Sequence, residues 1–112
     1  MSAPRLNRRM ALEERGTVAD GAGGFTESWT VLGLLWAEVR PRSGRDVAGE
    51  GAVVSATSYR ILLRGAPVGH STRPVPGQRL REGPRVFRID AVTEADASGR
   101  YLVCFAEEEL AA

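Results

Sequence analysis

The sequence contains no lysine, a single cysteine, a single histidine and no long hydrophobic run. One cysteine, Cys104, excludes an internal disulfide, and its place in the apolar run Tyr101–Ala106 predicts a buried, inert thiol. One histidine, His70, excludes a metal site built from several histidines and cysteines, and beside Ser71 in a proline-flanked loop it is expected to be solvated rather than catalytic. The longest apolar stretch, Val31–Ala37, falls far short of the roughly 20 residues of a spanning helix. We therefore expect no metal, no cofactor and no membrane span.

All 15 basic residues are arginines, set against 14 acidic residues, and the net charge is +1. So small a net charge excludes a bulk field that would draw the whole chain onto nucleic acid. Arginine presents a planar fork of donors that pairs with carboxylates and is desolvated more easily than lysine, so this composition favours contacts between subunits. With 112 residues, 43% hydrophobic and 26% charged, the chain is expected to form one globular domain over residues 1–112. The charged N-terminus lacks the apolar segment of a secretory signal, which predicts synthesis in the cytoplasm.

Apolar residues alternate with a period of two along most of the chain, which indicates strands. Met10 and Leu12 are predicted to face inward, and a glycine-rich turn over Gly16–Gly24 leads to a strand whose Phe25 and Trp29 are predicted to enter the core. Adjacent carboxylates such as Glu13 and Glu14 are expected on solvated faces.

Later segments repeat the alternation. The longest strand is predicted within Val53–Arg64, and Phe87, Ile89 and Ala91 are predicted to point inward from the strand that follows Pro84. Together the patterns predict an all-β fold, a small antiparallel β-barrel or sandwich of about six short strands. Two long loops, Pro41–Gly51 and Gly65–Gln78, are predicted between strands, and the first is the more probable site of function.

Trp36 is the residue most open to two interpretations. Its phase places it opposite Ala37 and Val39, outside the core, where a large aromatic side chain needs cover. That cover is either the N-terminal segment or a loop, or else a neighbouring subunit, because tryptophan is enriched at the centres of interfaces. Similarly, Arg40, Arg42 and Arg45 near Pro41 are either solvated charges, or lie near phosphates, or pair with a carboxylate of a neighbour.

Four motifs in order carry a resemblance to a known family. They are a Leu6–Arg9 element, a glycine turn leading to Trp29, a WAxxxPxSG element from Trp36 to Gly44, and the RVFRI strand Arg85–Ile89. In this order they resemble the head-tail joining proteins of long-tailed phages and gene transfer agents. The extended segment Gly65–Gln78 departs from the short proline turn that the family often has there.

The resemblance implies a β-barrel subunit of a hexameric or dodecameric ring in the virion, with the portal and adaptor on one side, the tail terminator and tail on the other, and double-stranded DNA in the lumen. It implies a stopper without enzymatic activity, which retains packaged DNA. The predicted channel loop comprises Arg42, Ser43, Gly44, Arg45, Asp46, Gly49 and Glu50. The predicted subunit interface comprises Trp36, Arg40, Arg60 and Arg88. The alternative is a barrel of the OB type that binds single-stranded nucleic acid through aromatic and arginine side chains.

Overall fold

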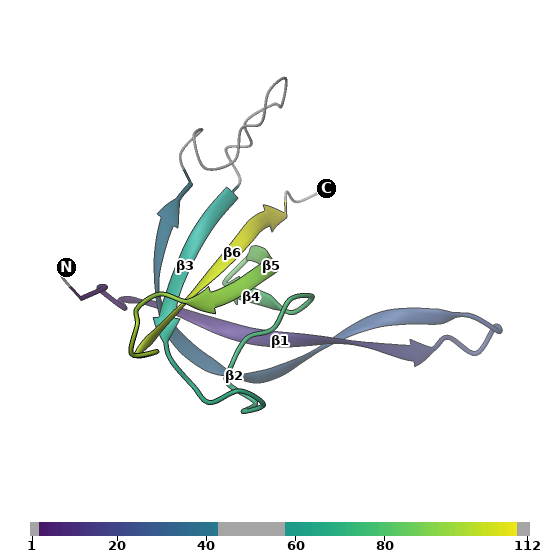
Figure 1. Ribbon diagram of the computed structural model, residues 1–112. Coiled ribbons are helices and arrows are strands. Elements are labelled where there is room, and N and C mark those ends of the chain that lie inside the picture. The colour runs from purple at the N-terminus through teal and green to yellow at the C-terminus, as the bar shows by residue number, and fades with distance from the viewer. Residues whose placement is uncertain (1–2, 43–57, 110–112) are drawn as a thin grey trace, which may run out of the picture.

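The computed structural model describes residues 3–42 and 58–109, which form six antiparallel strands and no helix (Figure 1). No helix long and apolar enough to cross a membrane occurs in these residues. The strands are β1 (Arg8–Ala19), β2 (Phe25–Pro41), β3 (Ser58–Arg64), β4 (Arg79–Glu82), β5 (Arg85–Glu94) and β6 (Tyr101–Glu109). They close into a barrel in the order β1-β2-β3-β6-β5-β4, so the predicted all-β barrel is confirmed.

The hairpin of β1 and β2 is longer than the sequence indicated. β1 continues to Ala19, and only residues 20–24 form the turn, where Gly21 and Gly23 take positive φ angles of 79° and 85°. Asp20 stabilises this turn by accepting hydrogen bonds from the backbone N–H groups of Ala22 and Gly24 at 2.8 and 3.0 Å. The outer half of the hairpin projects well beyond the barrel as a two-stranded arm (Figure 1). β2, with 17 residues, is the longest strand in the described parts, rather than the predicted strand within Val53–Arg64.

The barrel closes along a short seam between β1 and β4. Only three residue pairs join these strands, Ala11 with Arg81, Leu12 with Leu80, and Glu13 with Arg79. The interior beside this seam is filled by apolar side chains from all six strands, each almost completely buried: Met10, Leu12, Ala37, Ile61, Leu63, Leu80, Phe87, Ile89, Cys104 and Ala106. The interior is therefore a packed core.

Three predicted orientations are wrong. Phe25 lies on the projecting arm with 72% of its surface exposed, and Trp29, also on that arm, is only half-buried. Ala91 is exposed because a bulge between Ile89 and Ala91 shifts the register, so that Val92 packs against the core instead.

The β2–β3 and β3–β4 connections begin at opposite ends of β3 and so at opposite ends of the barrel (Figure 1). Residues 43–57 join β2 to β3 at one end, where the backbone N–H of Arg42 donates to the carbonyl of Ser58 at 3.0 Å. The segment 65–78 joins β3 to β4 at the other end and buries Pro74 completely. The first end is called the loop-bearing end below.

Candidate functional site: the loop-bearing end and the outer face

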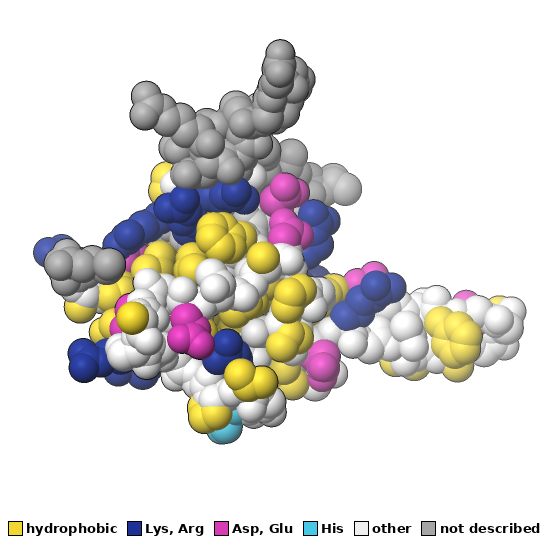
Figure 2. All heavy atoms as spheres, in the orientation of Figure 1, with side chains coloured by type: hydrophobic (Ala, Val, Ile, Leu, Met, Phe, Trp, Pro, Cys, Tyr) yellow, Lys and Arg dark blue, Asp and Glu magenta, His cyan; other side chains and the backbone are white. Residues whose placement is uncertain are grey.

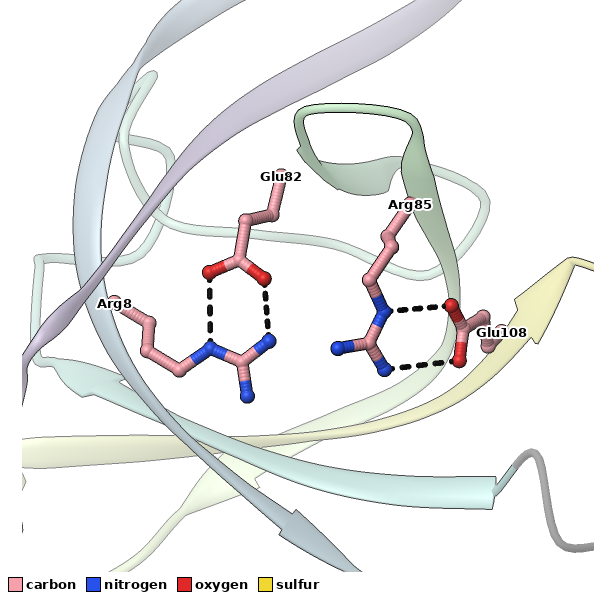
Figure 3. Close-up of polar contacts among 4 residues, drawn as sticks. All are labelled: Arg8, Glu82, Arg85 and Glu108. Carbon is pink, nitrogen blue, oxygen red and sulfur yellow. Dashed lines mark hydrogen bonds and ion pairs between the residues drawn. The ribbon is translucent and has the colours of Figure 1, made fainter.

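Four charged side chains face inward at the loop-bearing end, above the core. Alternation places Arg8 in phase with Met10, Glu82 with Leu80, Arg85 with Phe87, and Glu108 with Ala106. Arg8 donates to both oxygens of Glu82, from Nε to Oε2 at 2.9 Å and from Nη2 to Oε1. Arg85 donates to Glu108 from Nε at 2.8 Å and from Nη2 at 3.0 Å (Figure 3). We call these four residues the ion-pair layer.

The ion-pair layer rests on the aromatic top of the core. The Arg85 guanidinium lies 5.0 Å from the centre of the Phe87 ring, and Phe87 meets Tyr59 edge to face at 5.4 Å. Hydrogen bonding to Arg8 holds the pKa of Glu82 below its usual range, and hydrogen bonding to Arg85 does the same for Glu108. Because both pairs are bidentate, the layer at this end of the barrel carries no net charge and its side chains are held in place by their partners.

A second charged cluster holds the seam from outside. Glu13 is the only buried carboxylate of the described chain, with 3% exposure. Its oxygens accept hydrogen bonds from Nε of Arg79 at 2.6 Å and of Arg81 at 2.8 Å, and the Arg79 guanidinium stacks 4.0 Å above the Trp29 ring. Burial alone raises the pKa of Glu13, but the hydrogen bonds from Arg81 and Arg79 outweigh it, so the pKa lies below its ordinary value. The expectation of a solvated Glu13 was wrong because Arg79 and Arg81 share the outer face of β4 beside it.

The predicted interface arginines lie on the outer face around the loop-bearing end, where Figure 2 shows arginine side chains gathered. Arg40 and Arg60 are directly opposite each other on β2 and β3, and Arg60 is opposite Phe105 on β6. The guanidinium groups of Arg42 and Arg60 lie 5.3 and 5.9 Å from the centre of the Phe105 ring. The structure therefore brings Arg42 and Arg60 together over one aromatic ring.

Arg88 occupies the same outer face on β5. It contacts Glu107 at 3.2 Å and Asp90 at 3.4 Å, and about half of its side chain is exposed. Arg40 contacts Glu38 at 3.1 Å and is exposed to a similar extent. Both arginines thus retain exposed surface while held by neighbouring carboxylates.

Trp36 lines an apolar groove of about 480 Å³. Leu6, Leu34, Leu35 and Leu63 line this groove, and Arg64 contributes to its wall. The N-terminal segment reaches Trp36 through Leu6, yet 56% of Trp36 and 55% of Leu34 remain exposed. The N-terminal segment thus covers part of Trp36, as the first interpretation predicts, and the exposed remainder leaves room for the neighbouring subunit of the second.

Only one residue of the predicted channel loop lies within the described residues. Arg42 is described, whereas Ser43, Gly44, Arg45, Asp46, Gly49 and Glu50 lie outside the described residues.

His70 is exposed, and its Nδ1 lies 2.8 Å from Oγ1 of Thr72. Burial raises the pKa of Cys104 to about 12, in keeping with the predicted inert thiol. Within residues 3–42 and 58–109, no group of three or more histidine, cysteine, aspartate or glutamate side chains is placed to hold a metal ion.

Sequence reasoning missed the ion-pair layer and the arm. The layer was hidden because charged residues at inward positions near strand ends look like solvated termini, and the signal that reveals it is the two-residue phase shared with core residues. The arm was hidden because Phe25 and Trp29 alternate as core residues do.

Taken together, these features define an all-β protein with a filled, closed barrel. The chain matches, over residues 1–109, the model of the phage head completion protein family, and it belongs to that family. The predicted family, and with it a place in a phage-type particle, is confirmed.

Two solved structures resemble the chain over nearly its whole length. One is a chain of the virion of a native gene transfer agent particle, with 52% identity, a TM-score of 0.75, and coverage of 97% of this chain and 100% of that one. The other is the solution structure of a protein from Shigella flexneri 2a, with 24% identity and a TM-score of 0.73 over 100% of both chains, which supports the fold alone. A search of curated proteins gave no significant match.

Proposed function

We propose that the chain is a stopper-type connector, which forms a ring with copies of itself between the head and the tail and closes the DNA channel. The observation that carries this proposal is the filled core with the ion-pair layer above it. Because the core is filled and the ion-pair layer covers it, the described barrel leaves its outer surfaces and the segment 43–57 for function. The 52% identity to a chain of a gene transfer agent virion supports the same role.

The outer face supports a role in subunit contact. Arg40 and Arg88 each keep about half of their side chain exposed, and Arg60 lies directly opposite Arg40. Arginine pairs bidentately with carboxylates, so this face could bind a carboxylate-bearing neighbour. We therefore propose that Arg40, Arg60 and Arg88 face the next subunit of a ring of six or twelve copies.

The segment from Arg42 to Glu50 is proposed to reach the channel. This segment belongs to the β2–β3 connection, and both residues that flank that connection, Arg42 and Ser58, lie at the loop-bearing end, where a backbone hydrogen bond joins them. Arg42 and Arg45 would then lie near DNA phosphates, and Gly44 and Gly49 would allow the backbone to change conformation at low cost. The adaptor and portal are proposed on one side of the ring and the tail terminator and tail on the other.

Reconstitution with the portal and adaptor tests ring formation. We expect electron microscopy of the mixture to show a closed ring of this chain beneath the adaptor, and Arg60→Glu to weaken ring formation at least tenfold. Arg100→Glu is the matched control, because Arg100 is exposed in the turn between β5 and β6, away from the proposed contact. A chain that stays monomeric in the presence of both partners contradicts the proposal.

A single-strand nucleic-acid module is the second candidate, and one observation favours it. Phe105 lies on the outer face beneath Arg42 and Arg60, an arrangement that suits a stacked base. Salt-dependent binding to an oligonucleotide, lost in Arg60→Ala or Arg88→Ala, would support this function. Absence of binding at low salt would leave the connector as the better account.

A further inference from the structure

An exposed apolar stripe follows the outer face of β2. Its members are Trp36, Leu34, Val31 and Phe25, with 56, 55, 49 and 72% of their surface exposed. The register places them on one face. Trp36, Leu34, Val31 and Phe25 pair with Arg9, Ala11, Glu13 and Ala19 of β1, and these partners are separated by even numbers of positions. Exposed apolar side chains repeated along one strand are candidates for contact with another protein.

The outer half of the hairpin has no other strand beside it in the described chain. β1 pairs with β4 only at residues 11–13, and β2 pairs with β3 only from Ala37 onward. A two-stranded ribbon is marginally stable in water, and its open edges are templates for pairing with another chain. The arm is thus a structure that needs a partner.

The two ends of the stripe differ in shape. Phe25 protrudes at the tip of the arm, whereas Trp36 and Leu34 line the apolar groove of about 480 Å³ described above. One end is a knob and the other a hollow, and both are apolar. This is the complementarity that a shared contact requires.

The knob cannot enter the hollow of its own chain. β1 and β2 stay paired from Arg8 with Ala37 to Ala19 with Phe25, so Phe25 is held at the far end of the strand that carries Trp36. Eleven residue steps of extended chain separate them, a distance of roughly 36 Å. The two surfaces can therefore meet only between copies.

Charge points to the same occupant. Residues 14–28 of the arm carry three carboxylates, Glu14, Asp20 and Glu27, and one arginine, Arg15, a net charge of −2. One arginine, Arg64, lines the groove, and a second, Arg9, lies directly opposite Trp36 on the neighbouring strand. An acidic arm and a basic groove attract each other, whereas two arms or two grooves carry charge of the same sign and would repel.

We infer that the arm of one copy, led by Phe25, occupies the Trp36 groove of the next copy. Such a contact joins two different surfaces, so repetition of it generates a closed ring when the rotation permits. This inference rests on the proposed ring and assigns the contact that builds it.

Cysteine cross-linking inside assembled particles tests the inference. The double variant Phe25→Cys with Leu34→Cys places one thiol on the knob and one in the groove, both at exposed positions, while the native Cys104 is buried. After mild oxidation of purified particles, we expect a ladder of disulfide-linked multimers of this chain. Phe25→Cys alone gives no ladder, and neither does Phe25→Cys with Val68→Cys, whose second position is 85% exposed but outside the groove.

The outcomes separate the inference from the proposed function. If the double variant is present in particles and no ladder forms, or if Phe25→Cys links to a different protein, the arm-to-groove contact is wrong while the ring stands. If the wild-type chain is absent from the particles, the proposed function itself fails. If only the double variant is excluded from particles, a photoreactive phenylalanine analogue at position 25 repeats the test, and cross-links that miss the groove residues overturn the inference.

Discussion

At the scale of single residues, the buried carboxylate of Glu13 stabilises the seam that closes the barrel. It lies at the end of the three-pair seam that closes the barrel, and one buried carboxylate binds two arginines of β4. Removing one member of such a group leaves the remaining charges without a partner in a partly buried place, which costs more than the pair contributes. The seam thus depends on Glu13 more than its surface-like sequence context indicates.

Glu13→Gln is expected to lower the free energy of unfolding by about 2 kcal/mol, because Arg79 and Arg81 lose their carboxylate. Denaturant titration at pH 7 measures the change. Glu14→Gln is the control, since Glu14 is exposed and its replacement should stay within about 0.5 kcal/mol. Equal effects of the two variants would show that Glu13 does not hold the seam.

Individual residues also show where the sequence was sufficient. Alternation identified Met10, Leu12, Phe87 and Ile89 as core residues, because the period of two maps directly onto the two faces of a strand. It failed at Ala91, since a bulge adds one residue and reverses the phase without a signature in composition.

At the scale of elements, the loop-bearing end is held by pairs that each join two strands. Arg8 on β1 binds Glu82 on β4, past the last hydrogen-bonded pair of the seam, and Arg85 on β5 binds Glu108 on β6. The existence of six strands was predictable from turn residues and alternation. The length of the arm was not, because whether a hairpin continues past the barrel depends on which strands flank it.

Acid is expected to unfold the protein by protonating these carboxylates. The folded-state pKa values of Glu13, Glu82 and Glu108 lie below their unfolded values, so the stability they provide is present above about pH 4.5 and is lost as the pH falls through the folded values. The midpoint temperature of thermal unfolding should therefore fall as the pH is lowered below about 4.5.

A double variant checks the origin of this acid dependence. Glu82→Gln with Glu108→Gln should have a lower thermal midpoint at pH 7 and a shallower decline toward pH 3, and Glu109→Gln, at an exposed position, should follow the wild type. Parallel declines in all three proteins would place the acid sensitivity elsewhere.

At the scale of the whole molecule, a closed barrel carries an arm on one side, and the strand ends of β2 and β3 that the segment 43–57 connects lie at one end (Figure 1). The family was accessible from the sequence because its motifs are local strand and turn patterns in a fixed order, and the match over residues 1–109 bears this out. The contacts between copies were not accessible, since they depend on surfaces that only the folded hairpin assembles.

The most direct test of the stopper function shortens the segment between β2 and β3. Because Arg42 and Ser58 are already hydrogen-bonded, an Asn-Gly turn in place of residues 43–57 should close the hairpin and leave the barrel intact. In cells that make heads but no tails, the amount of nuclease-protected DNA per head is the measurement. We expect heads that contain the shortened variant to lose protected DNA while wild-type heads retain it. Equal protection in the two kinds of head, with the variant present at wild-type levels, would contradict the account.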